Sequence, residues 1–128
     1  MAIIVDTDVI SYIFKMDTRA ITYEEHLFHT PKFISFMTLA ELRRWQFQSS
    51  WGENKISSFQ ALLEDFGVVY ADDEICTNWA RITVESSSKG KPISPSDAWI
   101  AAAALMFDIP LLTHNKKHFE HIADLVLL

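Results

Sequence analysis

Three acidic side chains follow points where an apolar or turn segment gives way to a helix, and their type and placement suit metal chemistry. Asp6 closes the apolar run of residues 2–5, while Glu41 and Asp97 each fall in the first turn of an expected helix. Magnesium prefers oxygen ligands, keeps several waters and is usually held by a few carboxylates together with substrate phosphate. Acids that meet in one cleft would form such a site, and a metal held there can activate water for attack on phosphorus.

Each of these acids also has a structural explanation. Thr38 and Glu41 have the spacing of a capping box, and Asp97 lies three residues after Ser94, where an acid complements the dipole of its own helix. An acid that ends a buried strand, as Asp6 does, can cap the following helix. The functional interpretation therefore depends on the set of positions and their order, not on any single residue.

The elements that must position these residues alternate between strand and helix along the chain. Strands are expected over residues 2–5, 33–36, 68–70, 111–113 and 125–128. Helices are expected over residues 9–14, 18–28, 38–47, 55–65, 72–84, from Pro95 to just before Pro110, and 116–121.

Such alternation favours a parallel sheet covered by helices on both faces, with its ligand site at the carboxyl ends of the strands. Thr113 and Asn115 come just past one strand end, as Asp6 comes just past another. Glu41 and Asp97 stand at helix starts that follow the loops at this edge. We therefore expect all five side chains to converge on one edge of the sheet.

The size and composition predict one compact domain over residues 1–128. The hydrophobic fraction is 49%, and a chain of this length buries a sizeable core but leaves no room for a second domain. The net charge of −6 argues against a protein that holds nucleic acid by a broad basic face. It does not exclude RNA cleavage, because a bound divalent ion inverts the local charge and attracts phosphate.

Nothing in the sequence indicates a membrane or an oxidising compartment. The longest apolar run, residues 98–107, is about half of what a bilayer crossing needs. No basic segment with an apolar core of signal-peptide length opens the chain. The single cysteine, Cys76, has no disulfide partner and is interpreted as a small buried hydrophobe. We expect a cytoplasmic protein.

Four segments, in this order, resemble the PIN domain family and look most like its VapC-type toxins. They are IIVDTDVIS at 3–11, TLAEL at 38–42, SDAWIAA at 96–102 and LLTHNKKHF at 111–119. Each motif alone would be weak, but the four together span nearly the whole chain. The resemblance implies a three-layer α/β/α sandwich around a parallel sheet of about five strands.

The resemblance also implies a divalent-metal endoribonuclease that forms a homodimer and is blocked by a small antitoxin protein. Asp6, Glu41 and Asp97 match the family's metal-binding acids, Asn115 matches its fourth position and Thr113 a hydroxyl beside it. Magnesium is the expected metal, with manganese able to substitute. Some relatives carry a further acid where this chain has His118, so we expect only one firmly held ion.

Three other interpretations remain open at this stage. The Asp6-Thr7-Asp8 motif resembles the nucleophile motif of haloacid-dehalogenase-like phosphatases, with Thr113 and Lys116 as the later elements. That family needs an acidic pair after those elements, whereas Asp72-Asp73 comes before them. A module with this fold could bind a partner without turnover. Zinc could use three histidines of the C-terminal segment, His114, His118 and His121. That segment, however, lacks the glutamate of an HExxH motif and contains no cysteine.

Several other residues near the predicted edge have assigned roles. Asp8 is interpreted as the N-cap of a helix at Val9, with coordination through water as the alternative. Trp79 and Trp99 fit core positions, whereas Trp45 and Trp51 are expected to face a partner or stack on bases. The candidates for RNA backbone contacts are Lys15, Arg19, Arg43, Arg44, Lys116 and Lys117, although a solvated face with ordinary ion pairs is the favoured interpretation for most of them.

Overall fold

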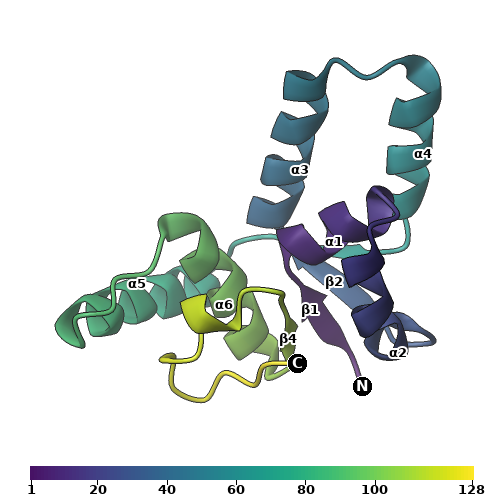
Figure 1. Ribbon diagram of the computed structural model, residues 1–128. Helices are drawn as coiled ribbons and strands as arrows, with labels where there is room; N and C mark the ends of the chain where they lie inside the picture. The colour runs from purple at the N-terminus through teal and green to yellow at the C-terminus, as the bar shows by residue number, and fades with distance from the viewer.

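The computed structural model describes residues 1–128 as alternating strands and helices (Figure 1). The strands are β1 (Ile3–Val5), β2 (Lys32–Ser35), β3 (Gly67–Val69) and β4 (Leu111–Leu112). The helices are α1 (Thr7–Phe14), α2 (Glu24–Leu27), α3 (Phe36–Ser49), α4 (Glu53–Leu63), α5 (Asp73–Ser88) and α6 (Pro95–Phe107). Short 3₁₀ helices cover Thr18–Tyr23 and Lys116–His118.

The strands form one parallel sheet in the order β3-β2-β1-β4. The chain steps outward from β1 through β2 to β3, and β4 then pairs with the other side of β1. The strand order therefore reverses between β1 and β4, which is the point where open α/β sheets place their ligands. Asp6 follows β1 and Thr113 follows β4 at this reversal.

Helices cover both faces of the sheet, as predicted. On one face Ile4 and Leu111 belong to a core that includes the alanine-rich face of α6 and Ile75 of α5. On the other face Ile3 and Val5 belong to a second core, together with residues of α1, α3 and α4. The alternation along β1 sends successive side chains to opposite faces, so this central strand joins the two cores into a three-layer α/β/α sandwich.

The expected fifth strand is reduced to a single bridge. Leu127 pairs with Leu111 in parallel, and residues 125–128 otherwise have no strand partner. The expected helix over residues 18–28 is divided into the 3₁₀ helix Thr18–Tyr23 and the single turn of α2. The last expected helix is likewise only the 3₁₀ turn Lys116–His118.

Helices α3 and α4 extend away from the sheet as a pair joined at their far ends (Figure 1). Trp45 of α3, Trp51 of the loop between the two helices and Phe59 of α4 pack edge to face, and Phe14 of α1 joins them with its ring 4.8 Å from that of Phe59. This packing gives Trp45 and Trp51 an internal role, and a partner contact through their exposed parts stays a prediction. Both rings are half-buried, and they pack against the core.

Three further outcomes concern side chains outside the site. Trp79 and Trp99 stack face to face at 4.9 Å between α5 and α6, as core positions should. Cys76 is exposed on α5, so its expected burial is wrong. None of the helices combines the length and apolar character that a membrane crossing needs.

Candidate active site

Asp6 sits at the end of β1 and is almost fully buried, with 6% of its surface exposed. It is the N-cap of α1: Thr7 N donates to its Oδ1 at 2.7 Å, while Thr113 Oγ1 donates to its Oδ2 at 2.7 Å. Asp6 therefore takes the capping role that the sequence suggested for Asp8. Because both carboxylate oxygens accept a hydrogen bond, the side chain is held in one orientation at the β1–β4 boundary.

Asp8 instead lies in the first turn of α1, with one oxygen turned toward the segment after β4. Val9 N donates to its Oδ1 at 2.7 Å, and Asn115 Nδ2 donates to its Oδ2 at 2.8 Å. Thr113 Oγ1, while donating to Asp6, accepts the N–H of Asn115 at 3.1 Å. These bonds fasten the residues after β4 to those after β1, and they bring Asp8 into the candidate site.

Glu41 reaches the site from α3 but not as part of a capping box. The N-cap of α3 is Ser35, whose Oγ accepts the N–H of Met37 at 3.1 Å, so the capping box predicted at Thr38 is wrong. Glu41 Oε1 instead accepts the hydroxyl of Thr7 at 2.8 Å.

Thr7 is a site residue that the sequence reasoning missed. Its Oγ1 lies 3.0 Å from that of the buried Thr38, so the two hydroxyls form a chain that ends on Glu41. Thr7 has a single hydroxyl hydrogen; when that hydrogen goes to Glu41, the hydroxyl of Thr38 supplies the other bond. A hydroxyl directly after Asp6 was the signal available in the sequence, but only the fold shows its partner.

Asp97 faces this cluster from the start of α6. Its N–H is capped by Ser94 Oγ at 3.1 Å, as predicted, and its Oδ2 lies 3.3 Å from His118 Nδ1. Its charge also acts on the carboxylates of Asp6, Asp8 and Glu41, each of which has a pKa that Asp97 raises. The predicted residues of β1, α3, α6 and β4 therefore do converge on one edge.

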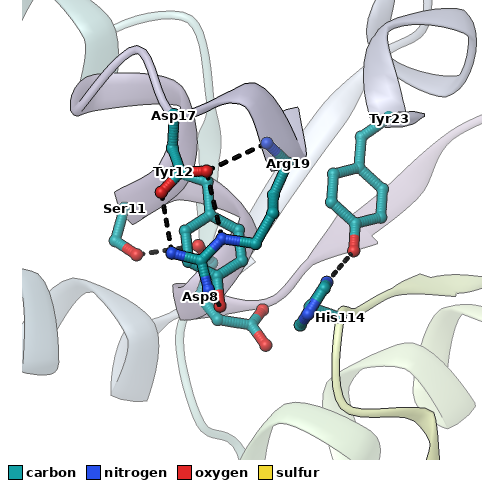
Figure 2. A network of polar contacts seen from close by, with 7 residues as sticks. All are labelled: Asp8, Ser11, Tyr12, Asp17, Arg19, Tyr23 and His114. Carbon is teal, nitrogen blue, oxygen red and sulfur yellow. Dashed lines mark hydrogen bonds and ion pairs between the residues drawn. The ribbon is translucent and has the colours of Figure 1, made fainter. Parts of the chain in front are cut away.

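A network of polar and aromatic contacts supports the turn that carries Thr113 and Asn115 (Figure 2). His114 Nδ1 is hydrogen-bonded to the hydroxyl of Tyr23, and its ring lies edge-on to Tyr12 at 5.2 Å. The Arg19 guanidinium covers Tyr12 at 3.9 Å and pairs with Asp17 at 2.7 Å. The wall beside Asp8 is thus built from α1 and the 3₁₀ helix after it.

The three C-terminal histidines do not share a site. His114 contacts Tyr23, His118 contacts Asp97, and His121 Nε2 lies 2.9 Å from the hydroxyl of Ser86. Their imidazoles have separate partners, which disfavours the zinc interpretation, since a catalytic zinc needs three ligands at one point.

The carboxylates of the site destabilise one another's charged forms. Burial, followed by the charge of Asp8 and to a lesser extent that of Asp97, raises the pKa of Asp6 to about 7, against the hydrogen bonds from Thr113 and Thr7 that lower it. Burial also raises the pKa of Asp8 and of Glu41, and for each the charge of Asp97 adds to the increase. Such clustered acids favour a proton or a cation between them.

The donor set suits a hard divalent cation in its chemistry. The acidic and amide ligands at the edge offer oxygens, from Asp6, Asp8, Glu41, Asp97 and the amide of Asn115, whose nitrogen is already bonded to Asp8. The side chains as placed do not form a finished coordination sphere, since no three acidic, histidine or cysteine side chains are grouped closely enough to hold an ion. This spacing agrees with an ion that keeps several waters.

Comparison with known proteins identifies the family. The family model described as PIN domain matches residues 3–125. The ribonuclease VapC1 of Haemophilus influenzae is 33% identical over 127 residues, covering 98% of this chain and 95% of that protein. The chain belongs to the PIN domain family.

Other relatives place this PIN domain among VapC-type chains. The solved structure of VapBC-1 from nontypeable Haemophilus influenzae contains a chain that matches with a TM-score of 0.86 and 32% identity, covering 100% of this chain and 97% of that chain. The tRNA(fMet)-specific endonuclease VapC of Shigella flexneri is 24% identical over 120 residues, covering 94% of this chain and 91% of that protein. The resemblance stated from the four sequence segments is confirmed.

Proposed function

We propose that this protein is a magnesium-dependent endoribonuclease, the toxin of a toxin–antitoxin pair, with its metal at the edge formed by Asp6, Glu41 and Asp97. The observation that supports it most is the convergence of acids from three separate elements at the β1–β4 reversal, where the charge of Asp97 raises the pKa of Asp6, Asp8 and Glu41. Membership of the PIN domain family favours this activity over the phosphatase interpretation.

In this proposal some residues of the site hold the metal ion and others orient those ligands. Asp6 and Asp97 hold the ion, with Glu41 and Asn115 completing its surroundings directly or through water, and manganese can substitute for magnesium. A bound divalent cation supplies positive charge at the scissile phosphate and activates water for in-line attack. Thr113 orients Asp6 and Thr7 orients Glu41 through the hydrogen bonds they donate.

The expected partners follow from the relatives. VapBC structures combine a chain like this one with a second protein, and an antitoxin that covers the acidic edge would block the entry of RNA. We also propose a homodimer, which light scattering of the purified protein would test. The proposed substrate is RNA, which would be cut at a phosphodiester bond.

The test is cleavage of a mixed structured RNA pool by the purified chain, freed of any co-purified partner, in magnesium, manganese or EDTA. Asp6→Asn and Asp97→Asn should each abolish cleavage while retaining the fold. Asp65→Asn is the matched control, because it removes the same charge from an exposed turn after α4. Products should carry 5′ phosphate and 3′ hydroxyl ends, as expected for hydrolysis by activated water.

Two results would contradict the proposal. Cleavage that persists in EDTA, or in both site variants, would mean that the activity is not carried by these acids. A folded protein that binds magnesium through Asp6 and Asp97 but cuts no RNA would favour a binding module with the PIN fold.

A further inference from the structure

A polar cavity of about 420 Å³ adjoins the candidate site and is not explained by the metal-binding acids. Its walls come from the loop before α6, with Lys91 and Ser94, and from the segment after β4, with Lys117, His118 and His121. Asp97 lines this cavity and also faces the acidic cluster, so the two spaces share a wall. A volume of several hundred Å³ is within the range of small-ligand sites.

Two lysines line the cavity of a protein that is acidic as a whole, and two acids line it with them. Neither Lys91 nor Lys117 is ion-paired with an acidic side chain, which leaves both ammonium groups available to an anion. Lys116 adjoins Lys117, and Lys89 Nζ donates to His121 O at 3.0 Å. Lys91 and Lys117 line the cavity together with the acids Asp97 and Glu120, whereas Lys89 and Lys116 are not among its lining residues.

The wall that carries these groups is fixed by internal bonds. Ser86 is buried at the end of α5, its hydroxyl lies 2.9 Å from His121 Nε2, and its carbonyl accepts the N–H of Lys91 at 2.9 Å. One serine therefore ties both sides of the cavity to the same helix. Burial and the nearby charges of Lys89 and Lys91 lower the pKa of His121, which favours the neutral form of this cavity-lining imidazole.

His118 links the cavity to the reacting edge. Its Nδ1 is directed to Asp97 Oδ2 at 3.3 Å, which leaves the opposite ring nitrogen to contact another group. The PIN resemblance places His118 where some relatives have an additional acid. This chain thus has no carboxylate at that position to repel a phosphate.

We propose that this cavity binds a phosphate of the RNA strand next to the scissile one, through Lys91 and Lys117, with His118 between that phosphate and Asp97. The proposal rests on the proposed function, because it assumes that RNA reaches the acidic edge. It gives the strand a defined direction: the strand passes from the metal-binding acids across Asp97 into the gap between α6 and the C-terminal segment. Phosphate contacts of this kind position the substrate without reading its bases.

The test compares Lys91→Gln, Lys117→Gln and the double variant with Lys55→Gln as the matched control. Lys55 lies on α4, 4.8 Å over the Trp51 ring and outside the cavity, and its substitution removes the same charge. With a short fluorescent single-stranded RNA in magnesium, the double variant should raise KM about tenfold and leave kcat within about twofold. The slope of log KM against log salt should fall by about 0.7 for each phosphate charge no longer neutralised.

A scan of the same RNA with single neutral methylphosphonate linkages identifies the phosphate concerned. Wild type should lose affinity at one linkage beside the cleavage site, and the double variant should show no further loss there. If the double variant has the same KM and salt slope as Lys55→Gln, the cavity is not a phosphate subsite.

The two proposals can fail independently. If wild type binds this RNA but does not cut it, the proposed function fails, and RNA affinity by fluorescence anisotropy still tests the cavity with the same variants. If wild type cuts RNA and the double variant cuts it with unchanged KM, the cavity proposal alone fails.

Discussion

At the scale of single residues, the site is built around the carboxylate of Asp6, whose burial destabilises its charged form. Asp6 is enclosed by its own hydrogen bonds from Thr7 and Thr113, yet burial and the neighbouring acids raise its pKa to about 7. A group with that pKa is about half ionised near neutral pH. Magnesium and protons should therefore compete for Asp6 in the physiological range.

The pKa of Asp6 predicts how the stability of the metal-free protein depends on pH. The folded pKa lies above the ordinary value of 3.8, so this group contributes stability that is fully present below 3.8 and is lost as the pH rises through about 7. In EDTA, thermal unfolding of wild type should occur at a lower temperature at pH 8 than at pH 5, and Asp6→Asn should reduce that difference. Magnesium should stabilise wild type more at pH 8 than at pH 5. An Asp6→Asn variant with an undiminished difference would show that Asp6 is not the group responsible.

The hydroxyl of Thr7 predicts an effect on turnover without a large effect on the fold. Thr7→Val keeps the shape of the side chain but removes the 2.8 Å bond to Glu41, leaving a half-buried carboxylate unsupported. Hydrogen bonds to charged groups contribute about 1.5–3 kcal/mol, so kcat should fall about 10- to 100-fold. Thr7→Ser retains the hydroxyl and should keep most of the activity. Equal losses in the Val and Ser variants would mean that the hydroxyl bond to Glu41 does not by itself account for the effect.

At the scale of the elements, sequence periodicity predicts which segments are strands and helices but not which residue begins each helix. The alternation of apolar segments and turns placed β1, β2, β3 and β4 within a residue or two. The start of α3 was misplaced because Ser35 and Thr38 are both competent caps, and only the end of β2 decides between them. Likewise, Asp6 and Asp8 are both residue types that cap helices. Asp6 is the N-cap of α1 because β1 ends directly before it, at Val5.

The convergence of the site could be predicted from the sequence, whereas its bonds could not. The rule that ligands gather at the carboxyl ends of parallel strands located Asp6, Thr113 and Asn115 correctly. The bond between Thr7 and Glu41 joins residues 34 positions apart in the chain. It depends on how α3 crosses α1, which no local pattern encodes.

The pairing of β2 with β3 predicts a strict requirement for glycine at position 67. Gly67 pairs with Phe33, and a Cβ added at Gly67 would lie 2.6 Å from Phe33 Cδ1, well inside the contact distance. Gly67→Ala should therefore lower the free energy of unfolding by about 1–3 kcal/mol, measured by urea denaturation. Adding Phe33→Leu to Gly67→Ala should recover part of that loss relative to Phe33→Leu alone. No recovery in this double-mutant cycle would show that the ring of Phe33 is not what excludes the side chain.

At the scale of the whole molecule, the protein's acidity opposes the binding of a nucleic-acid strand unless a cation offsets the charge. The net charge is −6, and at least four carboxylates stand at the edge where the substrate must arrive. Lys91 and Lys117 offset part of this repulsion beside Asp97, and Arg44 offsets part of it beside Glu41. Under the proposed function a metal ion would have two effects here, because it would supply charge for catalysis and also remove the repulsion that opposes binding.

This electrostatic balance predicts that RNA binding itself, and not only cleavage, depends on divalent metal. With a short unstructured RNA and fluorescence anisotropy, affinity in EDTA should be at least about tenfold weaker than in magnesium at equal ionic strength. Combining Asp6→Asn with Asp97→Asn should narrow that difference, because the repelling charges and the metal ligands disappear together. Asp65→Asn removes one charge from an exposed turn far along the chain from these acids, and it should leave the difference as in wild type. If wild type binds the RNA equally well with and without metal, the basic side chains alone hold the strand, and the acids of the site act only in the chemical step.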